Sequence, residues 1–254
     1  MCTLIISFQP NSHWPIIIAA NRDELIDRPW LPPDRHWPDR PDVIAGLDLL
    51  ADGSWIGIND GGVVAAINNR TATLGPLSGK RSRGELVLEA LDHYSAADAA
   101  EALSKLNPES YRAFNLVIAD AQGVFWLRNL EDPQPNTVQV ITIPPGLSML
   151  TAGEINDLES PRIHAYLSRF NNVSRPDPGS NDWSDWESLL LSRTHDLDAG
   201  PEAAMFIVST RGFNTLSSSI IALPAITQET LPIWRFARTY PEVEPFVEIK
   251  IKNQ

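Results

Sequence analysis

Cys2 is the first residue whose type and position could do chemistry, and it is the only cysteine among 254 residues. Its small side chain favours removal of Met1, so we expect the mature chain to begin with Cys2. A terminal cysteine carries a thiol and a free α-amine. With a reference pKa of about 7.7 to 8.0, that amine can act as the base for its own nucleophile. Such a residue suits attack on an amide or ester carbonyl, and the alternative is a cysteine that only packs in the core.

A second group of chemically active side chains follows the apolar stretch Ile16–Ala20. It consists of the consecutive residues Asn21, Arg22, Asp23 and Glu24. Functional residues often collect at strand ends. If this strand lies beside one that starts at Cys2, Asp23 could hold the ammonium form of the terminal amine and Arg22 could favour the thiolate. A surface turn of paired charges is the competing interpretation.

Two further polar groups follow predicted elements. Asn69 and Arg70 come after the apolar stretch Val63–Ile67, and an Asn69 N–H could donate to a developing oxyanion, with an Asx turn as the alternative. Arg83 belongs to Gly79–Gly84, where three cations precede a predicted helix and could hold an anion. This segment lacks the glycine spacing of a P-loop, and a turn that starts the helix is the other interpretation.

The elements that must position these residues are predicted from hydrophobic period and turn residues. Strands are expected at Thr3–Phe8, Ile16–Ala20, Ser54–Asn59, Val63–Ile67, Phe114–Ala119, Val124–Leu130, Thr137–Ile143, Leu147–Thr151, Met205–Val208, Leu216–Leu223, Ile233–Thr239 and Phe246–Ile251. Helices are expected at Glu85–Tyr94, Ala96–Leu106, Pro161–Phe170 and Trp183–Leu191, with Ser95 as an N-cap. Blocks of strands between helix pairs favour the α+β class, with two stacked antiparallel sheets and helix pairs on their outer faces.

The stretch Arg28–Asp42 contains five prolines and two tryptophans, which predicts a long loop rather than a helix or a central strand. The tryptophans indicate that it packs onto the body of the protein. The loop would pack either over a site, where it could act as a lid, or on the surface, where the tryptophans would only anchor it. Because no repeat, low-complexity tract or clear boundary appears, we expect a single domain over residues 1–254.

Composition excludes several function classes. Twenty basic and thirty-two acidic residues give a net charge of −12, which argues against binding to nucleic acid or an anionic membrane. The longest apolar stretches are a few residues long, whereas a membrane span needs about 20. With no secretion signal, a cytoplasmic location is expected. One cysteine and five scattered histidines predict no metal site and no disulfide.

Several segments together resemble a known family. They are Met1-Cys2-Thr3, Ala20–Glu24, Arg28-Pro29-Trp30, Ala45–Asp48, Gly53–Asn59, Asn69-Arg70 and Ser82–Val87. They look like the NRDE family, which is also the family of transport and Golgi organisation protein two. The resemblance is dense over residues 1–91.

This resemblance implies an N-terminal-nucleophile (Ntn) hydrolase-like αββα four-layer sandwich, related to cysteine acylases that cleave penicillin V and conjugated bile acids. It implies Cys2 as nucleophile, with Arg22, Asp23 and Asn69 around it. The segment Phe213–Ser219 resembles the family's Tyr-Gly-Thr-Arg-Ser-Ser, but Asn214 replaces the glycine and Leu216 the arginine, so that any arginine role would pass to Arg211 or be absent. Thr151–Glu154 also lacks the asparagine that acylases place there.

Two functions therefore stand as expectations. The first is a hydrolase that cleaves carbon–nitrogen or ester bonds of a small molecule through a Cys2 thioester, without a cofactor. The second keeps the fold as a non-catalytic carrier for haem or an acyl lipid, since eukaryotic relatives are linked to haem trafficking and lipid metabolism. In that alternative the cluster from Asn21 to Glu24 would hold a carboxylate or a loop, and Arg22, Arg70 and Arg83 would suit propionate or phosphate groups.

Overall fold

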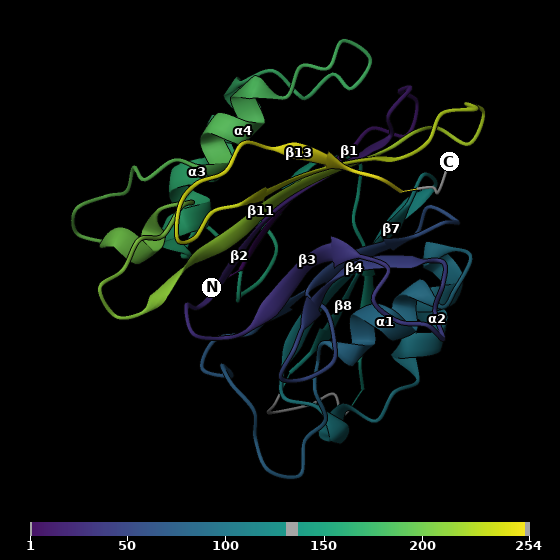
Figure 1. Cartoon of the computed structure of the whole chain (residues 1–254), viewed down its shortest axis with the longest axis horizontal. Coiled ribbons are helices and arrows are strands. Elements are labelled where there is room, and N and C mark those ends of the chain that lie inside the picture. Colours follow the sequence, from purple (N-terminus) through teal and green to yellow (C-terminus); the bar gives the residue numbers. More distant parts are fainter. Residues whose placement is uncertain (1, 131–136, 252–254) are drawn as a thin grey trace. The chain divides into compact units, whose positions relative to one another are not determined.

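The computed structural model describes residues 2–130 and 137–251. The chain divides into two compact units, and each is built on one antiparallel sheet with a helix pair (Figure 1). The first unit comprises Met1–Asp27 and Pro145–Lys250, and the second comprises Arg28–Pro144 and Ile251–Gln254. Met1, whose removal the sequence suggests, lies outside the described residues.

The first unit contains a six-stranded antiparallel sheet in the order β10-β1-β2-β11-β12-β13. The strands are β1 (Thr3–Phe8), β2 (Ile16–Leu25), β10 (Gly146–Leu150), β11 (Phe213–Leu223), β12 (Ile233–Arg238) and β13 (Val247–Ile249). The helices are α3 (Pro161–Asn172) and α4 (Ser184–Leu190), and a short 3-10 turn spans Pro201–Ala203. The two central strands, β2 and β11, are the longest, and every strand pair is antiparallel.

One face of this sheet packs against α3 and α4 (Figure 1). Helix α3 starts with a proline, which suits the first helical position, and buries Ile163, Tyr166 and Phe170 at helical spacing. The ring of Phe170 meets the ring of Trp186 on α4 edge to face, with centroids 5.3 Å apart. On the sheet side, the odd-numbered residues of β1 and β2, such as Ile5, enter this core. This face is called the helix-covered face below.

The second unit contains a seven-stranded antiparallel sheet in the order β3-β4-β5-β6-β7-β8-β9. The strands are β3 (Trp30–Asp34), β4 (Val43–Asp48), β5 (Ile56–Asn59), β6 (Val64–Asn69), β7 (Phe114–Asp120), β8 (Gly123–Asn129) and β9 (Gln139–Thr142). The helices are α1 (Glu85–Leu91) and α2 (Ala96–Ser104), and a 3-10 turn spans Pro108–Ser110. Each strand pairs with its neighbour along the chain, so the whole sheet is a meander.

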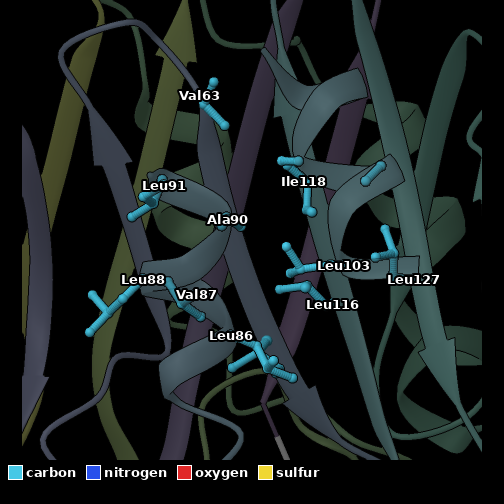
Figure 2. Packing of buried hydrophobic residues seen from close by; sticks show 14 of the residues in the cluster. Val63, Leu86, Val87, Leu88, Ala90, Leu91, Leu103, Leu116, Ile118 and Leu127 are labelled. Carbon is cyan, nitrogen blue, oxygen red and sulfur yellow. The ribbon is translucent and has the colours of Figure 1, made fainter. Parts of the chain in front are cut away.

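The core of the second unit lies between its helices and one sheet face (Figure 2). Leu86 and Val87 of α1 pack with Leu116 and Ile118 of β7, and all four side chains are fully buried. Helix α2 begins at the predicted cap, because the Ser95 hydroxyl accepts a hydrogen bond from the backbone N–H of Asp98.

The structure confirms the α+β order and the antiparallel pairing but corrects three elements. The proline-rich stretch is not a continuous loop, because Trp30–Asp34 forms strand β3 at the sheet edge, where missing proline N–H groups are tolerated. The following strand β4 had not been predicted. The expected strand Met205–Val208 is absent: Ile207 bonds to Thr215 through one backbone bond and one hydroxyl bond, which do not form a ladder.

Gly46 of β4 lies directly against the indole ring of Trp55, and this contact leads to a testable prediction. A Cβ atom at position 46 would lie 2.2 Å from Cη2 of Trp55. We expect Gly46→Ala to lower the free energy of unfolding by about 1–3 kcal/mol, because the ring or the strand must shift. Urea unfolding measures this change. Gly123→Ala, whose nearest new contact would be 3.5 Å, is the matched control and should change stability by less than about 1 kcal/mol.

Candidate functional site around Cys2

Cys2 lies directly before β1 in the first unit and is partly buried. Its Sγ donates a hydrogen bond to the backbone carbonyl of Asp23, with an S···O distance of 3.7 Å. Burial raises the pKa of the Cys2 thiol above its ordinary value, and the negative charge of Asp23 raises this pKa further. In the unprocessed chain the thiol is therefore protonated at neutral pH, and the reactive thiolate forms only as the pH rises.

The cluster at residues 21–24 is part of a strand, not a turn at a strand end. Strand β2 continues through these residues to Leu25, which corrects the predicted end at Ala20. Side chains alternate along a strand, so Asn21 and Asp23 share the helix-covered face with Ile17 and Ala19. Arg22 and Glu24 belong to the opposite face. The four polar residues are therefore divided between two faces of the sheet.

Cys2 and Arg22 lie at the same end of the β1–β2 hairpin. In its register, Thr3 pairs with Asn21, so Cys2 comes one residue before the paired strand and Arg22 one residue after Asn21. On the other side of β2, Arg22 pairs with Ser217 of β11. Arg22 is buried, with 4% of the residue exposed, and it adds a cation to the end of β2 that binds the thiol through Asp23.

The carboxylate of Asp23 forms a buried ion pair with Arg162, at the start of α3. Arg162 Nη1 donates to Asp23 Oδ2 at 2.8 Å, and the two side chains are 4% and 0% exposed. Thr215 of β11 donates its hydroxyl hydrogen to Asp23 Oδ1 at 2.7 Å. The carboxylate is thus held by a cation and a hydroxyl from two other elements, as a buried charge requires.

Asn21 connects the centre of the sheet to the segments that follow α4. Its Nδ2 donates to the carbonyls of Leu190 and Met205, each at 2.8 Å, and its Oδ1 accepts from the Ser218 hydroxyl at 2.7 Å. With the residue 1% exposed, three of the four hydrogen-bonding positions of the amide bind within the protein. The contacts of Asn21 therefore position the elements around the site. The Glu24 carboxylate accepts from the backbone N–H of Leu25 at 2.9 Å.

Three predicted site residues lie in the second unit. Asn69 ends β6, opposite Phe114 of β7, and its expected role as oxyanion donor stays a prediction. Arg70 donates to Oδ1 of Asn115 at 2.7 Å. Arg83 donates to the Thr73 hydroxyl at 3.0 Å and to a backbone carbonyl, so its contacts favour the turn that starts α1 over anion binding.

Arg211 lies on the surface of the first unit. Its side chain is 84% exposed, in the turn before β11, and its Nη1 lies 3.5 Å from the carboxylate of Glu202. The arginine that binds Asp23 is instead Arg162, which sequence reasoning missed. Its signal was weak, because Arg162 stands in a polar helix start like many surface arginines and is 139 residues away from Asp23.

The described residues contain neither a metal-binding cluster nor a membrane-spanning helix. No group of three or more His, Cys, Asp or Glu side chains within residues 2–130 and 137–251 is arranged to hold a metal ion. None of the helices in the described part of the chain has the length and apolar character needed to cross a bilayer.

Comparisons with known proteins agree with this architecture. A family model described as Transport and Golgi organisation 2 matches residues 1–225. No curated protein matches the chain. Among solved structures, the Caenorhabditis elegans ortholog of N-acylethanolamine-hydrolyzing acid amidase is similar, with a TM-score of 0.60 and 13% identity over 87% of this chain and 92% of that chain.

Two structures of conjugated bile acid hydrolase variants from Clostridium perfringens are similar as well. Both have a TM-score of 0.55, with 12% and 13% identity over 100% and 99% of this chain and 94% of theirs. At these identities the likeness shows the fold alone. It confirms the expected α+β, Ntn-hydrolase-like fold.

Proposed function

The chain belongs to the Transport and Golgi organisation 2 family, and from this premise we propose that it is an N-terminal cysteine hydrolase that cleaves a small amide or ester. The observation that carries the proposal is the position of Cys2. Its thiol lies directly before β1 and donates to the backbone carbonyl of Asp23, next to the buried Arg22 in sequence, in a fold shared with an acid amidase and a bile acid hydrolase.

The chemistry begins after Met1 is removed. The thiol proton passes to the free α-amine of Cys2, and the thiolate attacks the carbonyl carbon to give a tetrahedral intermediate. As this collapses, the carbon–nitrogen or carbon–oxygen bond breaks and the leaving group takes the proton from the α-ammonium. A thioester on Cys2 remains. Water, which loses a proton to the same amine, then attacks the thioester, releases the carboxylic acid and restores the thiol.

The neighbouring charges have separate roles in this scheme. Arg22 favours the thiolate and the negative charge that develops during attack. Asp23 favours the ammonium form of the α-amine and accepts the thiol hydrogen bond through its backbone carbonyl. The reaction needs no cofactor, because the nucleophile and the base belong to one residue. A location in the cytoplasm is proposed with it.

Intact mass and acyl trapping test this function. The purified protein is weighed, incubated with p-nitrophenyl octanoate at pH 8, quenched in acid and weighed again. We expect chains without Met1 to gain one octanoyl group, mapped to Cys2 by fragmentation, and to release more than one nitrophenolate per chain. Chains that retain Met1 should show no turnover. Absence of an adduct and of turnover in the processed protein, over a panel of amides and esters, would contradict the proposal.

A carrier for haem or an acyl lipid remains the alternative function. Two of its three expected arginines, Arg70 and Arg83, already donate to acceptors within the second unit, which weakens the support for ligand binding by them. Titration with haem and with acyl-coenzyme A separates the two functions. Saturable micromolar binding that Arg22→Ala removes, without any turnover, would favour the carrier.

A further inference from the structure

Arg162 donates hydrogen bonds to β1, which follows Cys2, and to β2, which binds the Cys2 thiol through Asp23. It is the second residue of the twelve-residue helix α3, and its side chain is 4% exposed. Its Nη1 donates to the hydroxyl of Thr3, next to Cys2 on β1, at 2.6 Å, and to Asp23 on β2 at 2.8 Å. Its Nη2 donates to the backbone carbonyl of Glu202 at 2.8 Å. One guanidinium therefore joins β1, β2 and the segment before β11.

Asp23 is the residue through which this contact reaches the thiol. Its backbone carbonyl accepts the Cys2 Sγ–H, while its carboxylate accepts from Arg162 and Thr215. The Thr215 hydroxyl in turn accepts from the backbone N–H of Ile207 at 2.8 Å, so its hydrogen is directed to Asp23. A displacement of the Asp23 carboxylate would move the backbone that bonds to Cys2.

We propose that Arg162 is a positioning residue for Cys2, because its guanidinium holds the Asp23 carboxylate in place and with it the backbone carbonyl that accepts the thiol hydrogen bond. This role rests on the proposed function in one respect, namely that Cys2 is the nucleophile. Arg162 acts on the thiol through Asp23.

The charges that act on the Cys2 thiol explain why the ion pair between Arg162 and Asp23 matters. Burial, Asp23 and Glu24 all raise the pKa of the Cys2 thiol. Arg162 offsets the charge of Asp23, which is the larger of the two acidic contributions. A lysine at position 162 would keep the charge but lose the planar fork that reaches Thr3, Asp23 and Glu202 together.

The test measures the pH dependence of Cys2 alkylation by iodoacetamide, which needs no turnover. Cys2 is the sole cysteine, so the reaction rate reports this thiol alone. Four proteins are compared: wild type, Asp23→Asn, Arg162→Met and the double variant. Asp23→Asn should lower the alkylation midpoint, since it removes the nearest negative charge. Arg162→Met should raise the midpoint and reduce the alkylation rate at pH 8 by about threefold to tenfold.

The double variant decides between positioning and a merely structural role. If Arg162 acts through Asp23, Arg162→Met should leave the midpoint nearly unchanged in the Asp23→Asn background. An equal shift in both backgrounds, or no shift in either, would overturn the inference. Should Arg162→Met fail to fold, Arg162→Lys replaces it in the same cycle and is expected to give a smaller shift of the same sign.

Arg169→Met is the matched control on the same helix. Arg169 lies seven residues beyond Arg162 on α3 and over the ring of Tyr166, with its guanidinium carbon 4.8 Å from the ring centroid. Its substitution should leave the alkylation midpoint of Cys2 at the wild-type value. Since alkylation is independent of hydrolysis, a failed coupling experiment and a failed hydrolase proposal give different results.

Discussion

Replacement of Cys2 by alanine should abolish ester and amide hydrolysis and the octanoyl adduct together. The side chain supplies the attacking atom, so its loss removes the covalent route rather than slowing it, and we expect turnover to fall by on the order of 10⁴-fold or more. Initial rates with p-nitrophenyl octanoate and intact mass measure the two effects in the same sample. Turnover that survives in Cys2→Ala would exclude the thioester mechanism.

Two further variants make this result specific. Cys2→Ser keeps a nucleophile beside the α-amine, but a hydroxyl is far less ionised than a thiol near neutral pH, so a residual rate about 100-fold or more below wild type is expected. Ser104→Ala, on α2 with its hydroxyl on an exposed helix end, is the control and should retain the wild-type rate. Intact mass must confirm that Met1 is absent from every protein compared.

Replacement of Asp23 by alanine should be the most destabilising change at the site. It leaves the guanidinium of Arg162, which is 4% exposed, without its carboxylate. Removal of one partner from a buried ion pair typically lowers the free energy of unfolding by about 3–5 kcal/mol. Urea unfolding followed by circular dichroism measures the loss. The Thr215 hydroxyl also loses its acceptor at 2.7 Å, which adds to the effect.

The control for this prediction is an exposed ion pair. Asp39, whose side chain is 71% exposed, lies 3.1 Å from Arg40, and Asp39→Ala should cost no more than about 1 kcal/mol. The double variant Asp23→Ala/Arg162→Met should recover part of the lost stability, because no buried charge is left without a partner. If Asp23→Ala unfolds at the wild-type urea concentration, the pair contributes little, and the positioning role of Arg162 loses its structural basis.

Much of the fold could be predicted because it depends on local patterns. The strands at Thr3–Phe8 and Phe114–Ala119, the helix pairs and the Ser95 cap follow from periodicity and from cap residues a few positions apart. The same local signals missed β3, where prolines hid an edge strand. They also placed a strand at Met205–Val208, where one backbone bond and one hydroxyl bond between Ile207 and Thr215 do not form a ladder.

The candidate site could be found from the sequence only as a set of residue types. Cys2 and the polar run at 21–24 are visible in the chain, but their division between two sheet faces depends on the continuation of β2 to Leu25. Which arginine binds Asp23 was beyond sequence reasoning, since Arg162 is 139 residues away from Asp23 and no motif marks it. A buried charge needs its partner in space, and only the packing of α3 on β1 and β2 determines that partner.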